Sequence, residues 1–498
     1  MKIEIINQKI TDFAGDVIIV NLFEGVTSPG GATGAVDRAL NGIISRLIKK
    51  GEIKGEFAET TIIHTPEKLK TERVLVVGLG KQKEFDLEQL RKIAGAAAHA
   101  CRKIRAKRIG TIVHGAGIGG IAPEKACQAL VEGTILGLYQ FKEYKKIENS
   151  QIKEFAIVEL DKKKIKPFKK GLKIGEILAQ SQNIARDLIN EPANNLTPEK
   201  LETRIKTLIK TTGLSKVIGF KCLYRKDLEK FGMGALLSVS QGSCNEPRLI
   251  ILRLKNSNKP LTTLIGKTVT FDSGGISLKP SAGMGAMKGD MAGGAAVIGA
   301  TIALARAKAR INLMTLIPAV ENMPSGSASR PGDVVRAMNG KTIEIISTDA
   351  EGRMTLADAI CYAEKQKAET IIDIATLTGG CVIALGDLTA AVMGNDQRLI
   401  DKLLSTSKRS GEHLWQLPLF KEYSEQLKSE IADLKNSGGR KASAITAGVF
   451  LQSFVDNARW LHIDMAGKES SEKSGFYTPA GGTGFGVRTL FEFVNEEL

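Results

Sequence analysis

The sequence has few cysteines and few aromatic residues. It contains six cysteines among 498 residues, and Phe, Trp and Tyr together make up 5% of the chain. The cysteines are scattered singly, with no CxxC pair and no histidine at zinc-finger spacing, which excludes a disulfide framework and a thiolate zinc site. We therefore expect reduced core cysteines at Cys101, Cys127, Cys222, Cys244, Cys361 and Cys381.

The sequence also lacks a long apolar run. Residues 291–305 form the longest uncharged run of note, but they are rich in Gly and Ala and fall short of the roughly 18 apolar residues that cross a bilayer. The first residues, MKIEIINQKITDFAGD, carry charges where a secretory signal needs an apolar stretch. We expect a cytoplasmic protein with no membrane partner and a buried helix at 291–305.

The sequence has fewer acidic than basic residues. Lys and Arg number 70 against 54 Asp and Glu, which gives a net charge of +16. This excess fits either DNA binding or a lysine-rich solvated surface, and the surface interpretation is the more general one. The basic segments at 101–108 and 161–170 carry few aromatic residues that could stack on bases. DNA therefore stays an alternative partner without a recognition motif to support it.

The length and the order of sequence patterns indicate two α/β domains. The N-terminal third alternates β-branched runs with amphipathic stretches, which is typical of a parallel or mixed sheet covered by helices. A basic, turn-prone segment at 161–170 precedes a helical pattern at 171–190. We predict a smaller N-terminal α/β domain at 1–165, a linker helix at 166–190, and a larger C-terminal α/β domain at 191–498 with a central mixed sheet flanked by helices.

A glycine motif in the first domain invites a nucleotide-binding interpretation. Residues 115–120 read GAGIGG, fit the GxGxxG pattern, follow an apolar run and precede a helical pattern. The dinucleotide fingerprint also needs an acidic residue at the end of the next strand, about 20 residues on. Here the next predicted strand lies at 155–160, which is too far along the chain. We favour a tight strand-to-helix turn, with a dinucleotide-dependent enzyme as the weaker alternative.

Charged residues gather beside buried segments of the second domain. Lys267 lies in the uncharged strand LTTLIGKTVTF, and Asp272 ends that strand beside a Ser-Gly-Gly turn. A lone lysine in a buried strand is unfavourable unless it is neutral or paired. Lys279 follows in the next loop, and Asp290 adjoins the Ala/Gly-rich run at 291–305.

A second group follows the apolar strand KTIEIIS. Asp349, Glu351 and Arg353 stand at positions i, i+2 and i+4, a spacing that aims all three side chains to one side if the chain stays extended. Each residue alone fits a structural role such as capping a turn. Four carboxylates bordering buried segments repel one another unless cations neutralise them. Two divalent ions match this charge, and oxygen ligands with one amine suit Mn²⁺, Mg²⁺, Co²⁺ or Zn²⁺ in a hydrolytic site.

At these residues the sequence resembles the leucyl, or cytosol, aminopeptidases. The segment STDAEGR is similar to the family's NTDAEGR signature, and LIGKTVTFDSGGISLKP with MKGDMAGGAAV is similar to its other metal-binding stretch. RDLINEPANNLTP, ATLTGG and HIDMAG extend the resemblance from about Arg186 to the C-terminus. The N-terminal domain resembles the family more loosely, through GGATGAVDRAL and FAET, which implies a macro-like α/β fold there.

The resemblance implies an aminopeptidase that removes leucine and other apolar first residues from peptides with a free N-terminus. It implies two divalent ions per subunit (Mn²⁺ or Zn²⁺, with Mg²⁺ or Co²⁺ as alternatives), a metal-bridged water as nucleophile, and a homohexamer. Asp272 and Glu351 would bridge both ions, and Lys279 and Arg353 would be the catalytic residues, Arg353 holding a bicarbonate or a water. The implied metal ligands are Lys267, Asp272, Asp290, Asp349 and Glu351.

The resemblance also implies a pocket for the first residue of the substrate. Met287 and the backbone at Thr376 and Leu377 match positions that line this pocket in the family. Ser347 takes the place of the leading Asn of the family signature, which lies close to the bound substrate. This difference leaves the implied metal ligands intact and concerns the shape and preference of the pocket.

Overall fold

The structure is a computed structural model that describes residues 1–65, 68–116, 120–145 and 152–496. Its contacts divide the chain into two compact units. Unit 1 comprises Met1–Gln180 with Lys473–Pro479, and unit 2 comprises Ser181–Glu472 with Ala480–Leu498. Within the described ranges, no helix combines the length and the apolar character that a membrane span requires. The family-implied two-domain α/β architecture is confirmed, and each unit is described by itself below.

Unit 1 is built around a six-stranded sheet in the order β1-β6-β5-β2-β4-β3, in which β3 is antiparallel to β4 and the other pairs are parallel. The predicted β-branched runs all form strands of this sheet. Its elements are β1 (Lys2–Ile6), η1 (Ile10–Asp12), β2 (Gly15–Leu22), α1 (Gly31–Ala39), α2 (Ile43–Lys49), β3 (Thr60–His64), β4 (Thr71–Gly78), η2 (Gln82–Glu84), α3 (Leu87–Lys103), β5 (Arg108–Thr111), α4 (Pro123–Gly137) and β6 (Glu154–Val158).

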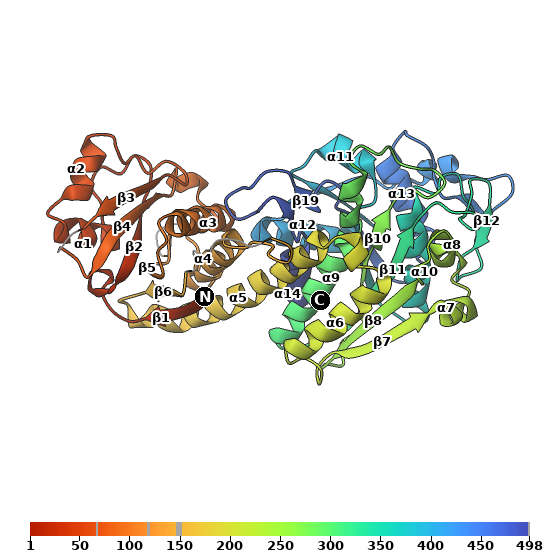
Figure 1. Cartoon of the computed structure of the whole chain (residues 1–498), viewed down its shortest axis with the longest axis horizontal. Helices are drawn as coiled ribbons and strands as arrows, with labels where there is room; N and C mark the ends of the chain where they lie inside the picture. The colour runs from red at the N-terminus through yellow and green to blue at the C-terminus, as the bar shows by residue number, and fades with distance from the viewer. Residues whose placement is uncertain (66–67, 117–119, 146–151, 497–498) are drawn as a thin grey trace. The chain divides into compact units, whose positions relative to one another are not determined.

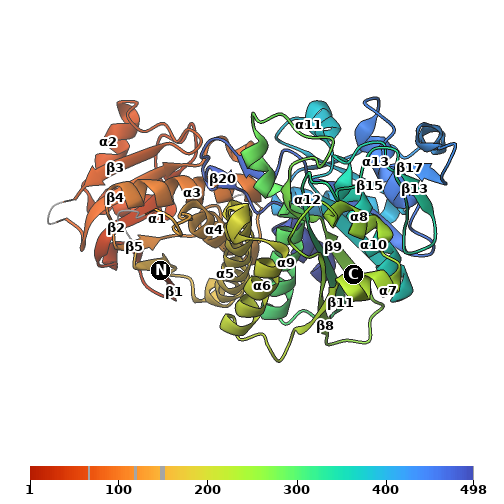
Figure 2. The same cartoon turned by 45° about the vertical axis from the view of Figure 1, so that its right-hand side comes forward.

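Helices cover both faces of this sheet, as Figures 1 and 2 show. Successive residues of β2 point to opposite faces, so that Val17 and Ile19 pack in the cluster under α3 and α4, whereas Ile18 and Val20 pack in the cluster under α1 and α2. The predicted turn after β5 begins at Gly115, whose φ of 71° favours glycine. Residues 117–119 of the GxGxxG motif lie outside the described residues.

The helix α5 (Lys162–Asn190) begins nine residues earlier than the predicted helical pattern at 171–190. The segment at 161–170 is therefore not a turn. Asp161 precedes the helix and accepts a hydrogen bond from the backbone N–H of Lys163 at 2.9 Å. Pro167 removes one backbone hydrogen bond but does not end the helix, because Phe168 beside it is fully buried in the core of unit 1. Packing outweighs local propensity here.

Unit 2 is built around a nine-stranded mixed sheet in the order β16-β15-β18-β14-β9-β11-β8-β7, with β10 paired to β11. Its strands are β7 (Gly219–Tyr224), β8 (Arg248–Lys255), β9 (Thr262–Gly266), β10 (Thr268–Asp272), β11 (Asn312–Asn322), β14 (Thr370–Ala375), β15 (Ala390–Gly394), β16 (Leu414–Gln416) and β18 (Arg459–Asp464). Small sheets are formed by β12 (Val334–Arg336), β13 (Thr342–Glu344) and β17 (Leu434–Lys435), and by β19 (Ser470–Ser471) and β20 (Gly481–Gly482).

The helices of unit 2 lie on both faces of the large sheet, with α9 on one face and α8 and α10 on the other (Figures 1 and 2). The predicted buried helix is confirmed as α9, in which residues 292–305 are all buried. The helices that begin in unit 2 are η3 (Ala193–Asn195), α6 (Pro198–Thr211), α7 (Arg225–Phe231), α8 (Gly234–Ser240), η4 (Met284–Gly289), α9 (Ala292–Arg306), α10 (Glu351–Lys365), α11 (Gly379–Leu385), α12 (Gln397–Ser410), η5 (Lys421–Leu427), α13 (Ser443–Gln452) and α14 (Val487–Glu496).

Candidate metal centre

The predicted site residues meet where several strands and helices of unit 2 begin or end. Lys267 links β9 to β10, and Asp272 is the last residue of β10. Asp290 stands between η4 and α9, and Glu351 is the first residue of α10. One carboxylate oxygen each of Asp272, Asp290 and Glu351 lies within 4.8 Å of the other two, and all three residues are buried. The fold thus gathers carboxylates from three separate segments into one cluster.

Lys267 lies inside this carboxylate cluster. Its Nζ is 2.8 Å from Asp290 Oδ1 and 2.8 Å from Glu351 Oε1, and it donates a hydrogen bond of 2.8 Å to the backbone carbonyl of Thr376. A Cβ atom at Gly352 would lie 2.4 Å from Lys267 Cε, so only glycine at this position leaves room for the lysine side chain. The lysine predicted to be unfavourable alone is paired with two carboxylates.

A second lysine connects the remaining carboxylates to the cluster. Lys279 Nζ is 2.8 Å from Asp272 Oδ2 and also contacts Asp349 Oδ1. Asp349 is the most exposed of the four carboxylates, with 39% of its side chain accessible. The chain reaches Lys279 through the Ser-Gly-Gly turn, where Gly274 has a φ of 87° and its backbone N–H donates to Asp272 Oδ1 at 2.9 Å. Lys267 and Lys279 therefore link all four predicted carboxylates.

Burial and like charges shape the electrostatics of the cluster. Burial raises the pKa of Asp290 well above its usual range, against the opposing charge of Lys267. Burial also raises the pKa of Asp272, and the nearby charge of Glu351 adds to the effect. Burial by itself would lower the pKa of Lys267, but the charges of Asp290 and Glu351 outweigh it and raise this pKa. Four carboxylates and two ammonium groups leave a formal charge of −2, which further cations would neutralise.

One buried atom of the cluster has no partner. Asp290 Oδ1 accepts a hydrogen bond of 2.7 Å from the Thr376 hydroxyl, but Asp290 Oδ2 is buried without any hydrogen bond. An unpaired buried carboxylate oxygen is unfavourable in a folded protein. Its position beside two further carboxylates is that of an oxygen ligand facing a cation. The donor set therefore fits hard or borderline divalent metal ions.

Arg353 lies apart from the linked carboxylates. The spacing of Asp349, Glu351 and Arg353 would aim all three side chains to one side only in an extended chain, and this condition is not met because Glu351 starts the helix α10. Arg353 is buried, and its Nη1 donates to the backbone carbonyl of Asn436 at 2.7 Å. Its Nε is buried without a hydrogen bond. Burial lowers the pKa of this guanidinium to about 10, against the opposing charge of Glu351.

Two asparagines that the sequence did not suggest hold the cluster in place. Asn322 ends β11 opposite Asp272, to whose Oδ1 its Nδ2 donates at 2.8 Å, and it also donates to the backbone carbonyl of Thr348 at 3.0 Å. Asn436 accepts hydrogen bonds from the backbone N–H groups of Ile346 and Ser347. The pairing of β10 with β11 is the signal that could have identified Asn322.

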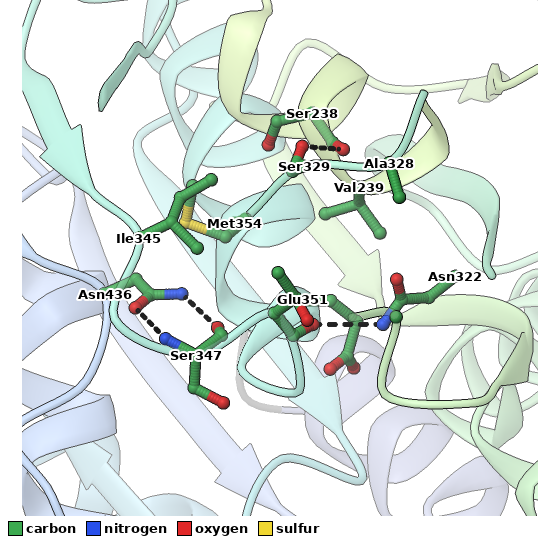
Figure 3. Close-up of a pocket in the computed structure, with 12 residues that line it drawn as sticks. Ser238, Val239, Asn322, Ala328, Ser329, Ile345, Ser347, Glu351, Met354 and Asn436 are labelled. Carbon is green, nitrogen blue, oxygen red and sulfur yellow. Dashed lines mark hydrogen bonds between the residues drawn. The ribbon is translucent and has the colours of Figure 1, made fainter. Parts of the chain in front are cut away.

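A pocket adjoins the cluster at Glu351. Figure 3 shows Ser347 and Asn436 on one side of it and Asn322 on the other, with Ser238 and Ser329 at its end. Asn436 and Ser347 exchange two hydrogen bonds, of 2.7 and 3.3 Å, that fix this wall. The predicted pocket residue Ser347 therefore lies beside the carboxylates. Among the described residues that line this pocket, Met287, Thr376 and Leu377 are not found.

These three predicted pocket residues lie on the Asp290 flank of the cluster. Met287 belongs to η4, three residues before Asp290, and Thr376 contacts both Asp290 and Lys267 as described above. The backbone N–H of Leu377 donates to Asp464 Oδ1 at 3.0 Å. The ends of β14 and β18 thereby hold this flank of the cluster.

Comparisons with known proteins define the class of this chain. Residues 183–491 match the model of the cytosol aminopeptidase family, catalytic domain, and residues 19–148 match the model of the N-terminal domain of the same family. With the carboxylate cluster, these matches define a metal-dependent aminopeptidase, a hydrolase of the N-terminal peptide bond. The chain belongs to the cytosol aminopeptidase family.

Relatives cover nearly the whole chain. A probable cytosol aminopeptidase of Alkaliphilus metalliredigens is 42% identical over 99% of both chains, and that of Geobacter sulfurreducens is 42% identical over 92% of both. Among solved structures, a tomato leucine aminopeptidase mutant aligns with a TM-score of 0.89 at 31% identity, over 100% of this chain and 97% of that one. The bottromycin maturation enzyme BotP in complex with Mn aligns with a TM-score of 0.85 at 34% identity, over 97% and 99%.

Proposed function

We propose that this aminopeptidase holds two divalent metal ions per subunit and prefers peptides that begin with leucine or another apolar residue. The observation that carries the proposal is the buried group of Asp272, Asp290 and Glu351, with the unpaired Oδ2 of Asp290. Mn²⁺ or Zn²⁺ would be the native ions, with Mg²⁺ or Co²⁺ as alternatives. The ligands would be Lys267, Asp272, Asp290, Asp349 and Glu351.

Metal binding would change the protonation state of Lys267, and the reason is the charge around it. In the metal-free chain its ammonium group is the counter-ion of Asp290 and Glu351. Bound cations would take over that neutralisation and would favour the neutral amine, which has the lone pair that a ligand needs. The two lysines would therefore have different roles. Lys267 would be a neutral metal ligand, and Lys279 would stay protonated.

The bound ions would polarise the scissile carbonyl and supply a water of lowered pKa. Lys279 reaches Asp272 and Asp349 from the loop after the Ser-Gly-Gly turn, and its N–H groups would stabilise the oxyanion that develops on the carbonyl oxygen. Arg353 would hold a bicarbonate or a water as general base, and its unpartnered buried Nε fits an anion at that point. Lys279 and Arg353 are thus the proposed catalytic residues.

The proposed binding site for the substrate's first residue consists of Met287, Ser347, Thr376 and Leu377. Met287 would offer an apolar side chain on the Asp290 flank, where the backbone of Thr376 and Leu377 would line the same site, which suits a leucine side chain. Ser347 lies on the Glu351 side, where it is one of the residues that line the pocket of Figure 3. The two groups together would enclose the scissile bond from both sides of the carboxylates.

We also propose a homohexamer in the cytoplasm. Ile383 and Leu388, at and just beyond the end of α11, are 89% and 74% exposed, and such apolar surface favours burial against another subunit. DNA binding is a second candidate role, favoured by the net charge of +16. Retardation of duplex DNA at low salt that weakens steeply as salt rises would support this role, and its absence at low salt would remove it.

The proposed reaction is tested with metal-free protein and a panel of aminoacyl amides. Protein stripped by a chelator and reconstituted separately with Mn²⁺, Zn²⁺, Mg²⁺ or Co²⁺ is assayed for release of the first residue. We expect no activity without metal, restoration by Mn²⁺ or Zn²⁺, and the highest kcat/KM for leucyl amide among apolar residues. Titration of bound metal per chain should reach two ions. Activity that survives complete metal removal would contradict the proposal.

A further inference from the structure

A further carboxylate, that of Glu469, lies beside the metal centre and is not used by the proposed reaction. It follows β18 in the loop Ala466–Glu469, and it lies outside the group of carboxylates that meet within 4.8 Å. Its Oε2 is buried and has no hydrogen bond, and among the described residues none forms an ion pair with it. A buried carboxylate oxygen without a partner indicates that the partner belongs to a bound molecule.

The position of Glu469 places it on the Asp290 flank. A Cβ atom at Gly289, the residue before Asp290, would lie 3.3 Å from Glu469 Cγ. The start of the same loop is fixed to the end of β14, because Asp464 Oδ1 accepts from the backbone N–H groups of Leu377 at 3.0 Å and of Ala466 at 3.2 Å. Glu469 therefore lies next to η4, which carries Met287, on the flank that holds the apolar part of the proposed substrate site.

The neighbouring cations do not satisfy this carboxylate. Burial raises the pKa of Glu469, while backbone N–H groups and the charges of Lys267 and Lys468 lower it by less. Lys267 is engaged with Asp290 and Glu351. For Lys468, the charge of Asp387 contributes more than that of Glu469. A cation from outside the chain would therefore gain a charge-assisted hydrogen bond at Glu469 that no described residue supplies.

We propose that Glu469 is a specificity-determining residue that binds the cationic side chain of a lysine or arginine at the first position of the substrate. In the proposed reaction the free α-amine of the substrate would bind a metal ion as the neutral amine, so a cation at Glu469 must come from the side chain. Lysine and arginine place an aliphatic stem before their charge, and this stem can pack on Met287 as a leucine side chain would. The inference rests on the proposed function and extends its substrates from apolar to basic first residues.

The test uses pairs of substrates that differ only in charge. Arginyl and citrullinyl amides have the same shape, as do lysyl and norleucyl amides apart from the ammonium group. For the Mn²⁺-loaded full-length enzyme, we expect kcat/KM to favour arginine over citrulline by about 10-fold to 100-fold, the range of a charge-assisted hydrogen bond. The same ratio in Glu469→Gln should fall to near one, because the variant loses the charge that distinguishes the two substrates. Glu472→Gln, at an exposed glutamate three residues further along the chain, is the matched control and should keep the wild-type ratio.

Each outcome decides the inference. A wild-type ratio near one, or an unchanged ratio in Glu469→Gln, would overturn the role of Glu469 while leaving the aminopeptidase activity in place. A merely structural role would lower both members of a pair equally and would also overturn it. The wild-type ratio needs no variant, so misfolding of Glu469→Gln cannot hide the result. Absence of metal-dependent hydrolysis of leucyl amide as well would overturn the proposed function and this inference with it.

Discussion

Each unit of the chain buries a cluster of opposite charges, and the two clusters differ in how they are satisfied. In unit 1, Arg91 Nε donates to Glu132 Oε2 at 2.5 Å, and Gln128 donates to Glu132 Oε1 at 2.8 Å, so both carboxylate oxygens are occupied. In unit 2, four carboxylates face two lysines, and Asp290 Oδ2 remains unpaired. Balanced pairing is typical of a structural ion pair, whereas surplus charge of one sign indicates a binding site.

The difference has a simple physical basis. A buried ion pair is tolerated when hydrogen bonds satisfy every charged atom, and it then orients the helices that carry it, here α3 and α4. A cluster with excess negative charge is unfavourable in the metal-free chain, because burial has already removed the solvent that would screen it. Its persistence in the fold is explained by ions that bind it. Substitutions in the two clusters should therefore have opposite effects on activity and stability.

The largest effect is expected from Asp290→Asn, which preserves shape but removes one charge of the proposed ligand set. We expect kcat/KM on leucyl amide to fall by at least about 10³-fold, because both metal affinity and transition-state stabilisation are lost. Removal of one negative charge also relieves repulsion, so the free energy of unfolding of the metal-free chain should change little. Enzyme kinetics, metal analysis and denaturant unfolding check these expectations. Wild-type activity in the variant at full metal occupancy would contradict the assignment of Asp290.

The corresponding substitution in unit 1, Glu132→Gln, should have the reverse profile. Arg91 would lose its closest carboxylate in a fully buried position, and we expect the free energy of unfolding to fall by about 3 kcal/mol. The folded fraction should keep kcat/KM within about threefold of the wild type, because Glu132 belongs to the other unit. Urea unfolding and active-site titration measure the two quantities separately. A variant as stable as the wild type would show that this ion pair contributes no stability.

Local patterns in the sequence were enough to locate the strands of unit 1 and the carboxylates of unit 2. The β-branched runs predicted β2 to β6, because residues buried in a strand are usually β-branched or otherwise apolar. Charged residues beside uncharged segments, together with the family motifs, led to the residues of the cluster. These features are local, so they are readable without knowledge of tertiary contacts.

Features that depend on long-range contacts were not predictable in the same way. Asn322 reaches Asp272 only because β10 pairs with β11, and Asn436 meets Ser347 from 89 residues away. The early start of α5 depends on burial of Phe168 in a core that local propensity does not describe. Glu469 carries no motif, and its position beside Gly289 follows from the path of the loop after β18.

A third kind of buried carboxylate, that of Asp358 in α10, has neither a cation partner nor a place in the metal cluster. Its two oxygens accept backbone hydrogen bonds of 2.8 Å each from Leu236 and Met338. Burial raises the pKa of Asp358 to about 7, although these N–H groups oppose the shift. Asp358 therefore shows the effect of burial on a carboxylate pKa without the effects of an ion pair or of a metal ion.

A pH-dependent effect on stability is expected from Asp358. Its pKa is about 7 in the folded chain and about 4 when unfolded, so the folded state holds an extra proton between these values. Stability should therefore decrease as pH rises from about 4 to about 7, by at most about 4 kcal/mol at roughly 1.4 kcal/mol per pH unit. The side chain of Asp358→Asn cannot ionise. The free energy of unfolding of the variant minus that of the wild type should therefore increase as pH rises through that window. Urea unfolding of both metal-free proteins at pH 5, 6, 7 and 8 measures this difference, in which the titration of the shared carboxylates cancels. A constant difference across the series would place the pKa of Asp358 near that of an unfolded aspartate, and the backbone donors would then outweigh burial.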